Sequence, residues 1–128
     1  MAKINPDKQW QLFNKELEET MKLGDLYTLG AIYYEMTEFL VGEGKDGGQL
    51  RGLGYQMKLR LKKKDLKEYE AYKLLWVEIV CDDASCKKCK KMDGKVISLE
   101  EAKNTNPLPI KECARLGGCR CVYAPVIK

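Results

Sequence analysis

The sequence predicts an α+β protein in which three or four helices precede a small β-hairpin module. Apolar residues recur at helical spacing from Trp10 to Tyr72, and the period changes to that of a strand near residue 73. All six cysteines follow this change, at positions 81, 86, 89, 113, 119 and 121. We therefore divide the chain into a helical region, 1–73, and a cysteine-rich α+β module, 74–128.

The first two helices are predicted from their caps and apolar stripes. In residues 5–7, NPD, the asparagine can cap a helix whose first position is the proline. Gly24 ends this helix, and Asp25 caps a second one with an apolar stripe over 26–40. The glycine-rich stretch GEGKDGG, 42–48, predicts a loop. The apolar stripe of the first helix consists of Trp10, Phe13, Leu17 and Met21.

A third helical pattern begins near Gln49. The charged stretch KKKD at 62–65 is a candidate interruption, after which Leu66, Tyr69 and Tyr72 continue as a fourth helix. The apolar residues before this stretch are Leu50, Leu53, Met57 and Leu61.

The module begins with a β-prone stretch, LLWVEIVC at 74–81, whose side chains alternate between two faces. A turn at Asp93-Gly94 leads to a short strand, 95–97, and Ser98 with Glu101 forms a capping box for a short helix. The last strand is CRCVYAPV, 119–126, ended by its proline. We expect a helix of the first region to dock on this module and to bury Trp76 or Trp10.

Composition and charge indicate the cellular compartment of the protein and the charge of its partner. Charged residues make up 33% of the chain and are mixed in sign, which favours folding over disorder. The N-terminal MAKINPDKQW lacks the apolar segment of a secretory signal, and the longest apolar run contains Glu78. We therefore expect a cytoplasmic protein with reduced thiols and no membrane contact. Residues 1–50 are net acidic and 51–73 are net basic, a division that can steer an anionic partner.

The cysteine spacing predicts a structural zinc site that staples the module. Cys86 and Cys89 form a CxxC pair, and two intervening residues let both sulfurs reach one tetrahedral ion. A second cluster, Cys113, Cys119 and Cys121, supplies the remaining thiolates. A module of this size needs a metal site or a similar source of stability because its apolar core is small. The lysines expected to offset the charge of about −2 on such a site are Lys87, Lys88, Lys90 and Lys91.

Two other interpretations of the cysteines stay open. A strand followed by CxxC and lysines is superficially like a thiol–disulfide oxidoreductase, whose cations lower a thiol pKa. The helical region lacks the strand–helix–strand order of that class, and three more cysteines follow Cys89. Six cysteines can also form three disulfides, although the missing secretory signal argues against them. Cys81 is interpreted as a buried strand residue rather than a ligand.

Several positions besides the cysteines agree with a known family. The ordered set CKKC, MDGKVISLEEA, NPLPI, Cys113 and CRCVYAPV resembles the C-terminal segment of phage minor head, or head-morphogenesis, proteins. The resemblance covers residues 76–126. In that family a CxxC precedes a DGK-type turn, a proline-rich stretch, a His-Pro and a CRC that opens a strand. The resemblance implies a zinc-binding module of phage or mobile-element origin.

One departure from the family pattern concerns the ligands, because this chain has no histidine. With Cys113 in the place of that histidine, the resemblance implies a ligand set of Cys86, Cys89, Cys113 and Cys119, with Cys121 as a substitute for Cys119. The helical region resembles no part of a head protein. We therefore expect a free-standing small protein that uses the same module, and capsid assembly is not carried over.

The expected function is binding rather than catalysis. Zinc held by four thiolates has no open position for water, and the chain has no histidine for proton transfer at neutral pH. The leading hypothesis is a module that binds a protein partner. The second is nucleic-acid binding by residues 55–73, where tyrosines alternate with basic residues. The candidate phosphate contacts are Lys58, Arg60, Lys62, Lys63, Lys64 and Lys67.

Overall fold

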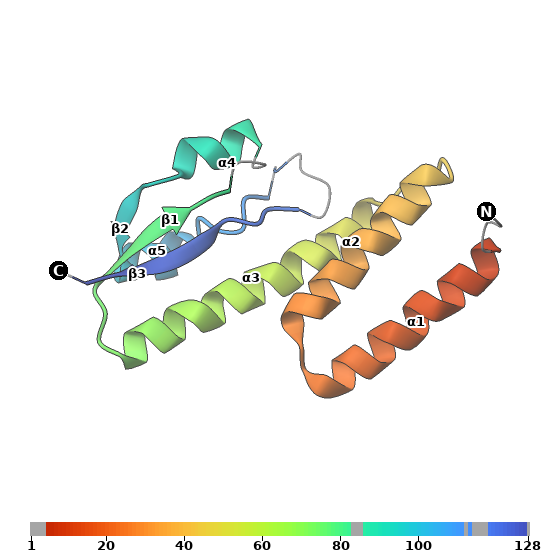
Figure 1. Ribbon diagram of the computed structural model, residues 1–128, viewed down its shortest axis with the longest axis horizontal. Coiled ribbons are helices and arrows are strands. Elements are labelled where there is room, and N and C mark those ends of the chain that lie inside the picture. Colours follow the sequence, from red (N-terminus) through yellow and green to blue (C-terminus); the bar gives the residue numbers. More distant parts are fainter. Residues whose placement is uncertain (1–4, 83–85, 112, 114–117, 128) are drawn as a thin grey trace. The chain divides into compact units, whose positions relative to one another are not determined.

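The computed structural model describes residues 5–82, 86–111, 113 and 118–127. Three helices come first, and a three-stranded antiparallel sheet follows them, which confirms the predicted α+β class (Figure 1). The third helix, α3 (Gly48–Ala71), ends just before the predicted change at residue 73. The chain forms two compact units, Met1–Met57 and Lys58–Lys128, and their boundary falls within α3.

The first helix, α1 (Pro6–Leu23), has the ends that its sequence predicts. The side chain of Asn5 accepts a hydrogen bond from the Asp7 N–H at 2.8 Å, and proline occupies the first helical turn. Gly24 adopts a φ of 68°, the left-handed conformation that ends a helix at little cost only for glycine. These two caps set the length of the helix.

The second helix, α2 (Leu26–Gly42), follows directly and is capped by Asp25, whose carboxylate accepts from the Thr28 N–H at 3.1 Å. Hydrogen bonds from the Thr28 hydroxyl and N–H lower the pKa of Asp25. The core of this unit is an apolar cluster in which aromatic rings meet at centroid distances between 5.8 and 6.3 Å. The rings in contact are Trp10, Phe13 and Phe39.

Helix α3 runs without a break through 62–65, so the interruption expected at KKKD does not occur. Lysines are good helix formers, and Leu66 and Tyr69 behind them anchor the helix in an apolar core. Early in α3, a Cβ atom at Gly54 would lie 2.9 Å from the ring of Tyr34, so only glycine fits this approach. None of the described helices is both long and apolar enough to cross a bilayer.

The second unit is built on a sheet with strand order β2-β1-β3 (Figure 1). The central strand, β1 (Trp76–Val80), pairs antiparallel with both β2 (Val96–Ser98) and β3 (Val122–Val126). Two short helices, α4 (Lys87–Met92) and α5 (Leu99–Thr105), lie before and after β2 in the chain. Ser98 caps α5 as predicted, because its hydroxyl accepts from the Glu101 N–H at 3.0 Å.

One face of the sheet forms the core of the second unit. Val77 and Ile79 of β1 are fully buried there together with Leu66 of α3, which realises the expected docking of a helix on the module. Trp76 points to the other face and stays 36% exposed, contrary to the expectation that docking buries it. The strand alternates its side chains, and Val77 and Ile79 occupy the buried face.

The last strand is shorter than its sequence predicts. It begins at Val122, so Cys119 and Cys121 precede the strand instead of lying on it. Pro125 lies within β3 and does not end it. Proline is tolerated there because β3 is an edge strand, and its missing N–H removes no hydrogen bond from the interior of the sheet.

Tyr123 joins β3 to the connection after α5. Its ring is buried, and its hydroxyl oxygen accepts a hydrogen bond from the Leu108 N–H at 3.2 Å. The carbonyl of Tyr123 in turn accepts from the Tyr69 hydroxyl at 3.0 Å. Burial raises the pKa of Tyr123 to about 12.

This pKa predicts a loss of stability in alkali. The ordinary pKa of tyrosine is about 10, so the stabilisation from neutral Tyr123 is complete below pH 10 and is lost as the pH rises toward about 12. In Tyr123→Phe nothing ionises at this position. The difference in unfolding free energy between wild type and Tyr123→Phe should therefore shrink over this range, as measured by urea denaturation. A constant difference over this range would contradict the prediction.

Candidate metal centre

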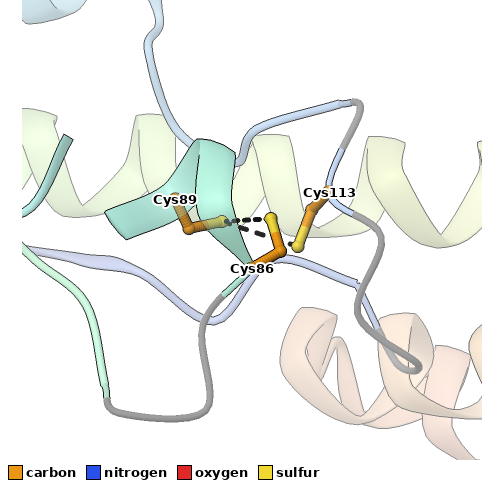
Figure 2. Close-up of side chains that lie close together, drawn as sticks. All are labelled: Cys86, Cys89 and Cys113. Carbon is orange, nitrogen blue, oxygen red and sulfur yellow. Dashed lines mark hydrogen bonds between the residues drawn. The ribbon is translucent and has the colours of Figure 1, made fainter. Parts of the chain in front are cut away.

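Four of the six cysteines in the second unit are not disulfide-bonded, and their thiols lie close to that of Cys89. The Sγ atom of Cys89 lies 3.6 Å from that of Cys86, 3.5 Å from that of Cys113 and 3.8 Å from that of Cys119. Figure 2 shows the first three side chains turned toward one another. A tetrahedral zinc ion with Zn–S bonds of about 2.3 Å sets its sulfur ligands about 3.8 Å apart. The sulfurs of Cys86, Cys89 and Cys113 also lie within 4.8 Å of one another, so these three suit ligands of one ion, whereas Cys119 is grouped only with Cys89 and Cys121.

Cys89 is the centre of this cluster. It belongs to two groups of three sulfurs that each lie within 4.8 Å of one another, and only 1% of the residue is exposed. The first group is Cys86, Cys89 and Cys113, and the second is Cys89, Cys119 and Cys121. The first group is positioned to hold a metal ion with three thiolates, whereas the second includes Cys121, whose sulfur is bonded to that of Cys81.

The first two sulfurs are brought together by helix α4. Cys86 stands just before this helix, and its carbonyl accepts the Lys90 N–H at 2.9 Å. Cys89 follows three residues later, so both side chains lie on the same side of one helical turn. Cys119 follows Gly118, whose φ of 79° allows a sharp turn toward the cluster that other residues rarely adopt.

The remaining two cysteines form a disulfide, Cys81–Cys121. Val80 and Val122 are paired at the ends of β1 and β3, so Cys81 and Cys121 face each other one position further along, with Cα atoms 4.4 Å apart. This differs from the expectation of reduced thiols and from that of Cys81 as a buried strand residue, since it is half-buried. A sulfur in a disulfide offers no thiolate, so in this state Cys121 does not compete with Cys119.

Two lysines of α3 lie beside the cluster. The Nζ of Lys58 donates a hydrogen bond to the Cys119 carbonyl at 3.0 Å, and Lys62 is only 9% exposed. Burial lowers the pKa of both lysines. The charge of Cys119 opposes this effect at Lys58, and the charges of Asp65 and then Cys119 oppose it at Lys62. The four lysines expected from the sequence to offset the thiolate charge, those of CKKCKK, are all exposed. Sequence reasoning missed Lys58 and Lys62 in this role.

The other candidate phosphate contacts lie elsewhere on α3. Arg60, Lys63, Lys64 and Lys67 are exposed, whereas Lys58 and Lys62 turn toward the interior of the unit. Of the tyrosines expected to stack on bases, Tyr72 is exposed and Tyr69 donates its hydroxyl proton to the Tyr123 carbonyl. The basic segment is thus divided between the interior and the surface.

The environment of Cys89 argues against a redox dithiol. Burial, together with the hydrogen bond that the Cys89 thiol donates to Cys113 and its hydrogen bond with Cys86, raises the pKa of the Cys89 thiol. A nucleophilic cysteine needs the opposite shift, because the thiolate is the reactive form. A divalent cation would instead stabilise the thiolate directly through its charge.

No protein-family model, curated protein or solved structure matches this chain.

The buried lysine leads to a prediction about metal affinity. Lys62→Met should weaken zinc binding about tenfold, because loss of one positive charge near a site of charge about −2 costs on the order of 1–2 kcal/mol at an effective dielectric constant of about 20. Competition with a chromogenic chelator measures this. Lys63→Met removes a neighbouring exposed charge and serves as the control. Equal affinities of the two variants would contradict the role of Lys62.

Proposed function

We propose that this chain is a non-catalytic zinc-binding protein whose metal centre stabilises a module that binds a protein partner. Cys86, Cys89, Cys113 and Cys119 would hold one Zn²⁺ as thiolates. Such a site has no open coordination position, so its contribution is to folding. The resemblance of residues 76–126 to the terminal segment of phage head-morphogenesis proteins supports a phage or mobile-element origin.

The observation that carries the proposal is the set of sulfur distances around Cys89. The sulfurs of Cys86, Cys89 and Cys113 lie within 4.8 Å of one another, as ligands of one tetrahedral ion require. The fourth sulfur, of Cys119, lies 3.8 Å from that of Cys89 and would have to approach the other two when metal binds. Four neutral thiols in an apolar core would not stabilise a desolvated cation nearby, whereas thiolates would. Lys58, bonded to the Cys119 carbonyl, fits a centre that carries negative charge, and so does the buried Lys62, whose charge is also offset by Asp65.

Zinc is the metal that this ligand set favours. Thiolates select soft or borderline ions, chiefly Zn²⁺, Cu(I) and the iron of Fe–S clusters. A closed four-sulfur site stapling a small fold is typical of zinc.

Native mass spectrometry of protein purified without chelator or reducing agent tests the proposal. We expect the mass of one zinc ion, lost on acid denaturation, after which four thiols react with an alkylating agent and the Cys81–Cys121 pair does not. Iron or copper in place of zinc would refute the choice of metal. Metal-free protein with thiols lost in pairs would refute the site and favour a disulfide framework.

A further inference from the structure

The sheet of the second unit has an outer face that the core does not use. Residues paired directly across strands point to the same side of a sheet, so the register defines this face. Trp76 is paired with Ser98 and Val126, Glu78 with Val96 and Ala124, and Val80 with Val122. We call these eight residues the outer face.

The solvent-exposed face of an antiparallel sheet usually carries polar side chains, but the outer face of this sheet is mostly apolar. Only Glu78 and Ser98 interrupt it. Val80 is 36% exposed, Val96 43% and Val122 44%, so these β-branched side chains contact solvent directly. A contiguous exposed patch of this kind marks an interaction site more often than a scatter of single apolar residues does.

A pocket lies at the end of the sheet where Trp76 is paired with Ser98, beside the end of α3 and helix α5. It has a volume of about 720 Å³, within the range of sites that accept a ligand or an anchoring side chain. Trp76 and Ser98, which form one row of the outer face, both line it, and Leu75 and Leu99 extend its apolar wall. Charged groups lie among the other lining residues, which are Glu70, Lys73, Leu74, Glu100, Lys103 and Asn104.

Glu78 determines which partner can cover this face. It is the middle residue of the central strand, flanked by Val96 and Ala124, and no cation among the described residues forms an ion pair with it. Covering the face with apolar groups alone would bury this carboxylate unpaired, which is costly. A second copy of the chain docked face to face would bring two Glu78 carboxylates together. A complementary surface must supply a positive charge at this point.

We infer that the outer face binds a segment of another protein in which aliphatic side chains surround a single lysine or arginine. The cation pairs with Glu78, the aliphatic groups cover the valines, and one apolar side chain enters the pocket beside Trp76. The inference deepens the proposed function, since it names the surface and the partner chemistry of the interaction module. It requires the sheet to be folded but requires no particular metal.

The experiment is a selection from a displayed library of random peptides on the full-length, metal-loaded protein. We expect enriched peptides that combine several aliphatic residues with one basic residue. A synthetic copy of the best peptide should bind Glu78→Lys at least tenfold more weakly than wild type, measured by fluorescence polarisation. Val122→Lys should weaken binding similarly. The control Glu68→Lys reverses an exposed charge on α3 and should leave the affinity unchanged.

Three results would overturn the inference. The first is a selection that enriches no peptide. The second is a set of enriched peptides that bind Glu78→Lys as tightly as wild type. The third is a wild-type dimer in sedimentation that Val122→Lys dissociates, because the face would then join two copies of the chain. Zinc content and melting temperature are measured on the same samples. Peptide binding to a folded protein without zinc would refute the metal centre alone, and zinc-loaded protein that selects no peptide would refute the docking surface alone.

Discussion

Replacing Cys89 with serine should abolish metal binding and unfold the second unit. Its sulfur makes all three of the short sulfur contacts in the cluster, so its loss removes the central ligand. Apparent zinc binding in small modules contributes about 10–16 kcal/mol to folding. This is as large as the whole stability of a typical domain, about 5–15 kcal/mol. Circular dichroism, thermal unfolding and zinc content measure the effect.

The matched control for Cys89→Ser is the double variant Cys81→Ser/Cys121→Ser. It changes the same residue type in the same unit but removes only the disulfide. We expect it to keep one zinc ion and to lose about 2–4 kcal/mol of stability, the usual contribution of a disulfide. A Cys89→Ser protein with unchanged zinc content and melting temperature would contradict the site. Loss of zinc from the double variant would instead make Cys121 a ligand.

Ile79→Ala should destabilise the second unit by about 2–5 kcal/mol. Ile79 is fully buried in the central strand, and truncation of such a side chain loses apolar burial and leaves a cavity. Urea denaturation in a Trp10→Phe background reports on this unit alone, because Trp76 is then the remaining tryptophan. The phenylalanine keeps an aromatic ring at position 10, in the cluster with Phe13 and Phe39.

Val80→Ala is the control for this cavity. Val80 is the next residue of the same strand, but it lies on the outer face and is 36% exposed. Its truncation should cost less than about 1 kcal/mol, because little buried area is lost. Equal destabilisation by the two variants would mean that the face assigned to the core is wrong.

Local signals in the sequence were enough to predict the caps of helices α1, α2 and α5. Asn5, Gly24 and Asp25 act through hydrogen bonds or backbone angles within four residues of themselves, so their effect can be inferred without knowing the fold. The alternation of residues 74–81 likewise indicated a strand, and Ser98 its following helix. These short-range effects are why the α+β class was predictable.

Features that depend on distant contacts were not predictable from the sequence. The continuity of α3 through 62–65 depends on Leu66 and Tyr69 packing in the second core. The exposure of Trp76 depends on which face of β1 that core covers. The start of β3 at Val122 depends on its register with β1. Each is decided by residues far away in the chain.

In the candidate site, too, features set by nearby residues could be predicted from the sequence and features set by distant contacts could not. The spacing of Cys86 and Cys89 indicated a ligand pair because one helical turn brings them together. The choice between Cys119 and Cys121 could not be read from spacing, since it depends on Cys81 facing Cys121 across two strands. The approach of Lys58 and Lys62 to Cys119 is also long-range. The ligand set itself stays a prediction until the metal is measured.

The position of Cys119, three residues before β3, has a consequence for how the chain folds. When the Cys81–Cys121 disulfide is reduced, the pairing of β3 with β1 closes a long loop, and this closure costs chain entropy before any contact forms. Metal binding by Cys89 and Cys119 closes nearly the same loop. Whichever event comes first therefore lowers the entropic cost of the other. Zinc should accordingly accelerate refolding of the second unit in the Cys81→Ser/Cys121→Ser variant, where no disulfide closes the loop in advance.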